Sequence, residues 1–465
     1  MQSVCMFEKL AILFVLATCL LASSVDAAVR ADGSVNILLV IADDMGVDKT
    51  SAYAEQASAP FTPTLEVLAE RGVLFRNAWA HAMCSPTRAS VMTGRHAFRH
   101  GVGSPGGVQM NESEETIAEV LGAAGYATAL FGKWHLGTQE GSLPTDQGFD
   151  FWSGTIANME DYFSWVRTEI DASGEVREFE ESRYATTAEA EDALAWIGEQ
   201  GSSPWFVTLA FHTPHSPFHV PPEHLYSGIT LNGQAGDRCN RTGPDEGSDC
   251  YAAMVQAMDT ELGLLLQGLE ELGVSDDTLI VFLGDNGTPG GATVTEEGSP
   301  FSREHAKGTV YEGGVNVPLI ITAGVNVGIT MTGSEQADLV MAMDLFATFA
   351  EIGAATPSSG NTVDAVSLLP YLETGQSPDR RAWVYSELYG EEDDRWAITD
   401  GQWKFLSNEG NMECYLLSRD AAESRDLLRR LNVGGSFKGK APSGPCLELA
   451  AQRPCKAGVN CLPDL

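Results

Sequence analysis

Short apolar runs that end in polar, glycine-containing loops recur along the chain. Four of them have the composition of buried strands, and they span residues 34–41, 126–131, 204–211 and 278–283. Segments with helical spacing of apolar residues lie between and around them, at residues 62–72, 114–125, 186–200 and 251–273. This alternation predicts an α/β fold with a large, mostly parallel sheet sandwiched by helices.

The C-terminal part has a different pattern. Residues 380–389, 395–407 and 413–418 are typical of antiparallel strands, and Asp400 with Gly401 is a typical two-residue hairpin turn. We therefore expect a large domain over residues 28–360. A smaller C-terminal α+β subdomain with an antiparallel sheet is expected over residues 361–465.

The first residues have the layout of a cleaved export signal. Lys9 precedes an apolar run over residues 10–22, and small residues follow up to Ala28. The run is short for a membrane span, which needs about 20 apolar residues, although an uncleaved anchor or a lipoprotein has a similar pattern. We expect residues 1–27 to be a signal peptide, and the protein to be periplasmic or secreted without stable membrane insertion.

Acidic residues outnumber basic residues by 64 to 28, which gives a net charge of -36. A chain of this charge repels nucleic acid and anionic membranes, so neither is expected as a partner. The same field opposes an anionic substrate, which a local cluster of cations would have to overcome. The composition suits a salty medium, where screening shortens the repulsion between surface acids to about 8 Å or less.

The cysteine count points to one unusual thiol. Of nine cysteines, two lie in the predicted signal, and the remaining seven are an odd number in a compartment that favours disulfides. Cys239 and Cys250 are close enough in sequence to close a local loop, and the four from Cys414 onward allow two more bridges of open connectivity. Cys84 is left over, and an ordinary buried free cysteine is one explanation for it.

Oxygen-bearing side chains follow two of the predicted strands. Asp43 and Asp44 come directly after the first strand, and Asp285 and Asn286 come after the fourth. Because ligands of parallel sheets bind beyond the carboxyl ends of the strands, these side chains are expected to meet. Three carboxylates and an amide oxygen suit Ca²⁺ or Mg²⁺ better than Zn²⁺, and without a cation the carboxylates would repel one another. Each pair taken alone is equally consistent with a helix cap or a turn.

Cys84 lies in the segment MCSPTR, where a helix is expected to begin because Ser85 is a good cap and Pro86 suits a first turn. The thiol would then lie at the positive end of a helix, with Arg88 on the next turn, and would ionise readily. The partners expected of a cysteine hydrolase are not evident, and a thiolate binds Ca²⁺ poorly. Neither explanation accounts for this cysteine well.

The segment CSPTR followed by TGR resembles the C-x-P-x-R element of the sulfatase family, a part of the alkaline-phosphatase-like superfamily. Further segments resemble that family in order and spacing, and they are IADDMG, GKWHLG, LPTDQGFDFW, HTPHSPF, GDNG, KGTVYEGGVNVP and DGQWKFL. The run from GKWHLG to LPTDQGFD is most similar to the branch of arylsulfatases and N-acetylgalactosamine-4-sulfatase. Asn316 departs from the family pattern, which commonly has arginine there, and this puts the local packing in doubt.

The resemblance implies that the large domain is catalytic and hydrolyses the sulfate ester of a small molecule or a glycan. In the family, a formylglycine-generating enzyme oxidises the motif cysteine, here Cys84, to an aldehyde during export. The hydrated aldehyde attacks sulfur, and a bound cation, here Ca²⁺ with Mg²⁺ as the alternative, makes its oxygen more acidic.

The resemblance also implies the site residues one by one. The implied metal ligands are Asp43, Asp44, Asp285, Asn286 and an oxygen of the modified Cys84. The implied catalytic residues are Arg88 and His135 on the hydrate, Lys133 and Lys307 on the sulfate, and His215 near the leaving-group oxygen. His212 is the weaker candidate for the last position. Cations and an acid of this kind suit a reaction in which negative charge develops on the leaving oxygen.

Two other functions remain open at the level of the sequence. A phosphonate monoester or phosphodiester hydrolase could use the same fold and the same modified cysteine, although the histidine-rich second zinc site of phosphatases is not evident. A non-catalytic binder of sulfated glycans would use the same cationic pocket. An intact thiol at Cys84 in the mature protein would favour the binder.

Overall fold

The structure is a computed structural model that describes residues 34–104, 109–239, 246–292, 300–358, 363–376, 380–388, 395–428 and 445–454. The predicted signal peptide, residues 1–27, lies outside the described residues, as do Cys455 and Cys461. Within the described parts of the chain, no helix is long and apolar enough to cross a membrane.

Ten strands form one large sheet, in the order β10-β2-β9-β8-β1-β7-β3-β4-β5-β6. The four strands predicted from the apolar runs are β1, β3, β7 and β8, and they are adjacent and parallel within this sheet. Antiparallel pairing occurs on both sides of this group, at β9, β5 and β6. The predicted α/β architecture is confirmed. The bounds are β1 Asn36–Ala42, β2 Val73–Trp79, β3 Ala127–Lys133, β4 Phe151–Thr155, β5 Trp165–Asp171, β6 Val176–Glu181, β7 Trp205–Ala210, β8 Thr278–Gly284, β9 Leu319–Ala323 and β10 Ser334–Met341.

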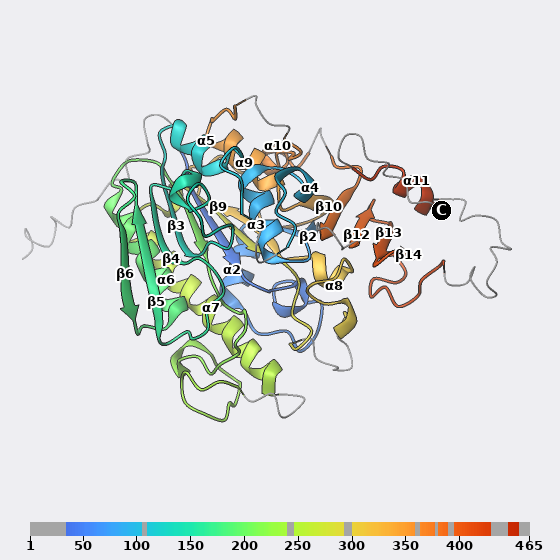
Figure 1. Ribbon diagram of the computed structural model, residues 1–465, viewed down its shortest axis with the longest axis horizontal. Helices are drawn as coiled ribbons and strands as arrows, with labels where there is room; N and C mark the ends of the chain where they lie inside the picture. Colours follow the sequence, from blue (N-terminus) through green and yellow to red (C-terminus); the bar gives the residue numbers. More distant parts are fainter. Residues whose placement is uncertain are drawn as a thin grey trace, which may run out of the picture.

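Helices cover both faces of the large sheet (Figure 1). Strand β1 shows why both faces need cover, because its alternate residues belong to two different apolar cores: Ile37 and Leu39 to one, Leu38 and Val40 to the other. The first core is closed by α3 Cys84–Thr93, α5 Ile117–Ala123, α9 Asp344–Ile352 and α10 Leu369–Thr374, and the second by α2 Pro63–Arg71, α6 Ala185–Glu199 and α7 Glu246–Glu271. Shorter helices are α4 Ala97–His100, α8 Glu312–Val315 and α11 Pro445–Ala450, with 3₁₀ turns η1 Val47–Lys49, η2 Thr145–Gln147, η3 Glu223–Leu225, η4 Ser275–Asp277 and η5 Arg303–His305.

A separate antiparallel sheet lies at the end of the molecule opposite β6 (Figure 1). It consists of β11 Val384–Leu388, β12 Arg395–Thr399, β13 Trp403–Asn408 and β14 Asn411–Leu416. Helix α10 follows the predicted domain boundary at residue 360, yet it packs in the first core of the large sheet. The boundary therefore stays a prediction.

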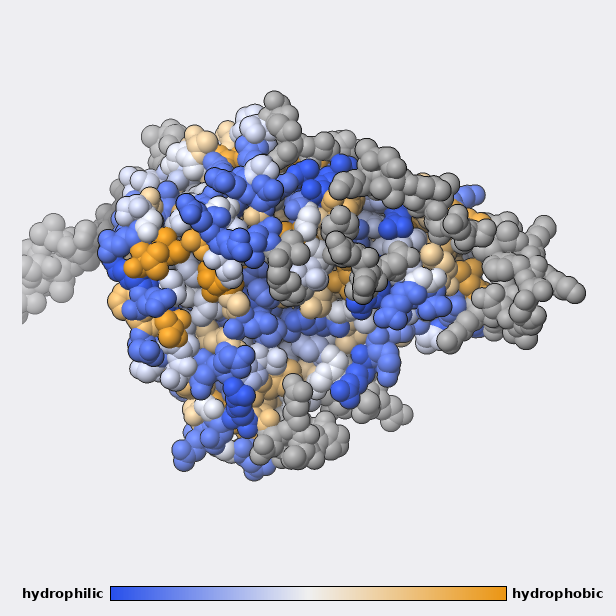
Figure 2. All heavy atoms as spheres, in the orientation of Figure 1, coloured by the Kyte–Doolittle hydropathy of each residue, from blue (hydrophilic) through white to orange (hydrophobic). Residues whose placement is uncertain are grey.

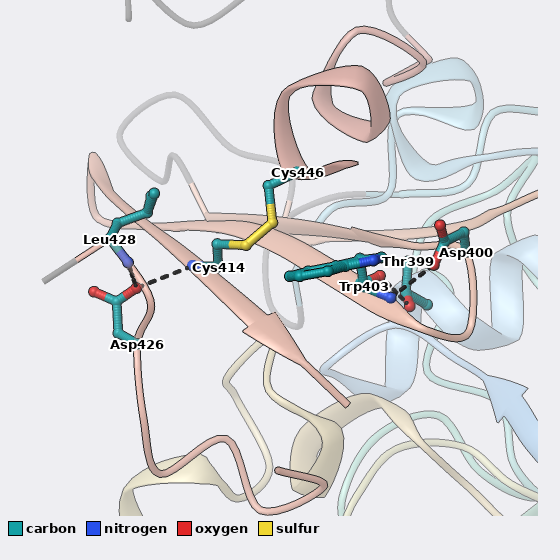
Figure 3. Close-up of a disulfide and its surroundings, with 7 residues drawn as sticks. All are labelled: Thr399, Asp400, Trp403, Cys414, Asp426, Leu428 and Cys446. Atoms are coloured by element: carbon teal, nitrogen blue, oxygen red, sulfur yellow. Dashed lines mark hydrogen bonds between the residues drawn. A yellow bond between two sulfur atoms is a disulfide. The ribbon is translucent and has the colours of Figure 1, made fainter. Parts of the chain in front are cut away.

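Two disulfides are present in the described parts of the chain. Cys239 bonds to Cys250, which is the local loop predicted from their spacing. Cys414 of β14 bonds to Cys446 of α11 and holds that helix against the small sheet (Figure 3). This pairing resolves one of the connectivities that the sequence left open.

The hairpin between β12 and β13 differs from the prediction by one residue. The amide of Asp400 donates to the carbonyl of Trp403 at 3.2 Å, so Gly401 and Gln402, rather than Asp400 and Gly401, form the tip. Gly401 has a φ of 84°, a backbone conformation that favours glycine. The Asp400 carboxylate instead accepts the amide of Trp403 at 2.7 Å (Figure 3) and that of Gln402 at 2.9 Å.

Hydrophilic residues cover most of the face seen in Figure 2, as the acidic composition leads one to expect. Among the exposed large apolar side chains, Val166, Val176 and Phe179 lie on the hairpin of β5 and β6. Strand β6 forms one edge of the large sheet, and it carries three glutamates among its six residues. Charges on an exposed edge strand oppose pairing with a strand of another molecule.

Buried histidines connect helix α3 to the small sheet. The ring of His81 lies 3.1 Å from Ser90 Oγ, which lies 3.0 Å from the ring of His100, and the other ring nitrogen of His81 contacts the backbone of Glu387 in β11. Burial lowers the pKa of His81 to about 4, and it holds the pKa values of His96 and His100 well below their usual range. These rings are neutral in the folded protein.

The native state is expected to lose stability as the pH falls below about 6.5. Between the folded pKa of His81, about 4, and the ordinary histidine pKa of 6.5, the unfolded chain binds more protons than the folded one, so acid favours unfolding. At about 1.4 kcal/mol per pKa unit, His81 alone contributes a loss of about 3 kcal/mol. Urea titrations between about pH 4 and pH 8 measure this, and His81→Gln should flatten the dependence. The exposed His224→Gln is the control, and an equal effect of both substitutions would contradict the assignment.

Candidate active site

Four adjacent parallel strands end at the same edge of the large sheet, and each is followed by residues that the sequence predicts to carry chemistry. These are Asp43 and Asp44 after β1, Lys133 at the end of β3, His212 and His215 after β7, and Asp285 and Asn286 after β8. Cys84 and Arg88 join them from the start of α3, and Lys307 joins them from the loop before α8. Segments far apart in the sequence therefore meet at one place.

The oxygen-bearing residues form a buried group. Asp285 accepts the amide of Asp44 at 3.0 Å, and the Asn286 side chain donates to the Asp44 carboxylate at 2.9 Å. Atoms of Asp43, Cys84 and Asp285 that could bind a metal lie within 4.8 Å of one another, and so do those of Asp43, Asp44 and His215. Among the described residues, Asp43 Oδ1 and Asn286 Oδ1 are buried without a hydrogen-bond partner.

Those two unpaired oxygens are the test of whether the residues fit a cation. A buried oxygen without a partner is costly, and a hard cation with oxygen ligands would satisfy both. Burial and the neighbouring Asp43 carboxylate raise the pKa of Asp285 to about 7, against the opposing field of Arg88. The neighbouring carboxylates thus repel one another in this buried site. Their oxygen atoms, with that of Asn286, fit Ca²⁺ or Mg²⁺.

Three cationic side chains neutralise the carboxylates. Arg88 donates two hydrogen bonds to Asp285 Oδ2, at 2.9 and 2.8 Å, and a third to the carbonyl of Lys133 at 2.9 Å. The Lys133 ammonium lies 2.5 Å from Asp43, and the Lys307 ammonium pairs with Asp44. Burial alone would raise the pKa of Asp43, but Lys133 and the other surrounding cations hold it well below its usual range.

Lys133 reaches this position because β3 and β7 approach closely. Gly132 precedes it with a φ of 95°, and a Cβ there would lie 2.1 Å from the carbonyl oxygen of Ala210. A side chain at position 132 would therefore push the two strands apart. The glycine in the segment GKWHLG has this structural reason.

Cys84 is the first residue of α3, and it is buried. The predicted cap is wrong: Met83 occupies the cap position, and the hydroxyl of Ser85 donates instead to the carbonyl of His135 at 2.8 Å. The expectation of a readily ionised thiol is also wrong, because burial raises the pKa of Cys84 more than Lys133 lowers it. Of the cysteines in the described parts, Cys84 is the one outside a disulfide, and its sulfur lies 3.2 Å from His135 Nδ1.

The two histidines of HTPH have different surroundings. His215 Nε2 lies 3.6 Å from Asp44 Oδ2, and its Nδ1 donates to the carbonyl of Ser216 at 2.7 Å. Burial lowers the pKa of His215, although Asp43 and Asp44 act in the opposite direction. His212 is fully buried and bonds to Glu189 and Thr155 instead. The geometry thus supports His215 over His212 for a role toward substrate.

Sequence reasoning missed the partners of these histidines. Glu189 lies in the middle of α6, and nothing in the helical pattern distinguishes it from a surface acid.

Asn316, which departs from the family pattern, donates to the Glu312 carboxylate at 3.2 Å and to the carbonyl of Arg76 at 3.4 Å. Glu312 also pairs with the buried Lys404 of β13 at 3.0 Å, so a cation from the small sheet serves this acid.

Comparison with known proteins agrees with this geometry. A family model described as Sulfatase matches residues 35–353. Human N-acetylgalactosamine-6-sulfatase is 30% identical over 377 residues, which cover 75% of this chain and 68% of that protein. Bovine arylsulfatase A is 30% identical over 415 residues, which cover 81% of this chain and 76% of that protein.

Solved structures share the fold. The crystal structure of Ps i-CgsB in complex with k-i-k-neocarrahexaose has a TM-score of 0.71 at 25% identity and covers 85% of this chain and 89% of that one. A phosphonate monoester hydrolase of Agrobacterium radiobacter has a TM-score of 0.64 at 23% identity, covers 85% of this chain and 92% of that one, and shows the fold alone. The matched family model and the relatives establish that this chain belongs to the sulfatase family and is a sulfuric ester hydrolase.

Proposed function

We propose that this sulfatase is exported and cleaves sulfate groups from a sulfated glycan or aryl ester, using formylglycine made from Cys84 and one bound Ca²⁺. The observation that carries the proposal is the place of Cys84, a buried unpaired cysteine whose sulfur lies within 4.8 Å of carboxylate oxygens of Asp43 and Asp285. A formylglycine-generating enzyme would be the partner during maturation. When present, the hydrated aldehyde supplies the nucleophilic oxygen and the cation makes that oxygen more acidic.

The proposed cation ligands are Asp43, Asp44, Asp285, Asn286 and the modified side chain at position 84. Arg88 favours the ionised form of Asp285 and holds its carboxylate in place through two hydrogen bonds, and it anchors the end of β3 through the Lys133 carbonyl. This arrangement fixes the carboxylates before any substrate arrives, so little reorganisation is needed during the reaction.

The remaining residues act on the ester and on protons. Lys133 and Lys307 are placed to neutralise the sulfate oxygens in a protein whose overall field repels anions. His135, whose Nδ1 faces position 84, takes a proton from the side chain there. When its ring carries both protons, His215 gives the one on Nε2 to the leaving oxygen, and the Nδ1 proton stays hydrogen-bonded to the Ser216 carbonyl.

Several observations support a glycan substrate. Relatives include N-acetylgalactosamine-6-sulfatase, and a solved neighbour was crystallised with k-i-k-neocarrahexaose. The strongly acidic composition suits a protein that works outside the cell in salt.

Mass analysis of the peptide that contains Cys84 tests the modification directly. Produced in a host with the converting enzyme, the peptide is expected to be about 18 Da lighter than the thiol form, as the exchange of a thiol for an aldehyde requires. Cys84→Ala should lose activity by a factor of about 10³ or more, because the nucleophile is gone. A fully active protein with an intact thiol would contradict the proposal.

Chelation is expected to lower the midpoint of thermal unfolding, since it leaves the carboxylates of Asp43, Asp44 and Asp285 facing one another. Ca²⁺ added at 100 times its Kd should raise the free energy of unfolding by about 2.7 kcal/mol. The effect of Mg²⁺ is measured in parallel. Asp43→Asn should abolish the response, whereas Asp171→Asn, at the end of β5, should leave it unchanged. Equal midpoints with and without Ca²⁺ would exclude a cation site here.

The choice between ester classes is tested with p-nitrophenyl sulfate and phenylphosphonate esters. We expect kcat/KM for the sulfate to be larger by about 100-fold or more, a difference of about 2.7 kcal/mol. Lys307→Ala should lower kcat/KM for the sulfate ester by a factor of about 10²–10³, because a positive charge that stabilises the reacting group is lost. Arg177 is exposed, and Arg177→Ala should leave kcat/KM unchanged. A preference for the phosphonate would favour the second reaction class, and a panel of sulfated sugars then identifies the substrate.

A further inference from the structure

We propose that a hydrogen-bonded relay of the buried Glu189 and His212 and the half-buried Thr155 positions the active-site histidine, His215. The inference rests on the proposed function only for what His215 does to the substrate. None of the three relay residues is proposed to touch the substrate, and each acts through the turn that carries His215.

The ring of His212 is held on both sides. Its Nδ1 bonds to the carboxylate of Glu189 in α6, and its Nε2 lies 2.6 Å from Thr155 Oγ1 at the end of β4. His212 and Glu189 are 1% and 3% exposed, so water does not compete for the bond between them. The second carboxylate oxygen of Glu189 also accepts the backbone amide of His212 at 3.4 Å.

Hydrogen-bond directions define the relay. The hydroxyl of Thr155 donates to the carbonyl of Ala157 at 2.7 Å, so its oxygen accepts a hydrogen bond from His212 Nε2. The ring therefore faces an acceptor on each side, the Glu189 carboxylate at Nδ1 and the Thr155 hydroxyl oxygen at Nε2. Because both ring nitrogens of His212 are hydrogen-bonded within the protein, neither is free to bind a substrate. His212 therefore has a different role from His215, although both belong to the segment HTPH.

The turn that holds the His212 ring also carries His215. The amide of His215 donates to the carbonyl of His212 at 2.9 Å. The hydroxyl of Tyr162 bonds to the carbonyls of His212 and His215, at 2.8 and 2.7 Å. The carbonyl of Thr213, between the two histidines, accepts the amide of the proposed metal ligand Asp43 at 3.1 Å. The relay thus fixes the His212 end of the turn, and the active-site residue Asp43 bonds to the Thr213 carbonyl within the same turn.

An error in the position of an acid catalyst is costly. A misplacement of about 1 Å can reduce the rate by about 10², and a positioned acid contributes about 10²–10⁴. The contribution grows with the basicity of the leaving oxygen, because a poor leaving group needs the proton more. A relay that positions His215 should therefore matter most for esters of weakly acidic alcohols and phenols.

The test uses Thr155→Val, which removes the acceptor from His212 while keeping the size of the side chain, and Thr155→Ser, which restores the hydroxyl. His212→Asn can keep the bond to Glu189 and loses the one to Thr155. The matched control is Thr128→Val, the same change near the start of the neighbouring strand β3, where the hydroxyl of a buried threonine bonds to the Gly148 carbonyl. A purely structural loss would affect all Thr→Val variants alike.

Rates are measured on aryl sulfates that span a range of phenol pKa values. Thr155→Val and His212→Asn should lose about 10–10² on esters of poor leaving groups and about 3-fold or less on p-nitrophenyl sulfate. Thr155→Ser should recover the wild-type dependence of the rate on the pKa of the leaving phenol. In combination with His215→Ala, Thr155→Val should add almost nothing, since the relay has no other route to the reaction.

Two outcomes would overturn the inference while leaving the proposed function intact. One is an equal loss on all leaving groups, and the other is full additivity of Thr155→Val with His215→Ala. If the wild type cleaves no sulfate ester, the proposed function fails, and crystal structures of the variants then decide the inference. His215 Nε2 still 3.6 Å from Asp44 Oδ2 in Thr155→Val would exclude a positioning role, whereas a displaced or disordered His215 ring would support it.

Discussion

The buried concentration of carboxylates at the end of β1 and β8 is the constraint on which the rest of the site depends. Three acids and an amide meet with almost no solvent around them, and such a group is stable only when cations compensate it. Arg88, Lys133 and Lys307 supply that compensation from three separate segments. In the proposed mechanism, two of these side chains, Lys133 and Lys307, would also meet the sulfate ester.

The cations are held by the surrounding structure and not by the carboxylates alone. The amide of Lys307 donates to the carbonyl of Thr288, and the carbonyl of the next residue, Gly308, accepts from Arg395 of β12. The small sheet therefore contacts the loop that carries Lys307, one of the proposed active-site lysines. A buried group of Lys404, Glu312 and Glu423 links β13 of the small sheet to α8 nearby, where burial raises the pKa of Glu423 to about 7. The small sheet thus contributes to the geometry of the active site.

Several site features were accessible from the sequence because they follow from strand ends. Residues placed directly after buried apolar runs must lie at one edge of a parallel sheet, so Asp43, Asp44, Asp285 and Asn286 meet as expected. The odd cysteine count likewise singled out Cys84, which is unpaired within the described residues. The motif resemblance supplied the residue roles, which spacing alone could not provide.

Other features depended on the tertiary structure. The ionisation of Cys84 could not be read from its place at a helix start, because burial outweighs the favourable field there. Met83 rather than Ser85 occupies the cap, since the Ser85 hydroxyl finds a partner in His135. By itself the sequence determined the α/β architecture and the residues at the strand ends, since both follow from local periodicity. The different surroundings of His212 and His215 and the balance of buried charge were decided by contacts between distant segments, which no local pattern encodes.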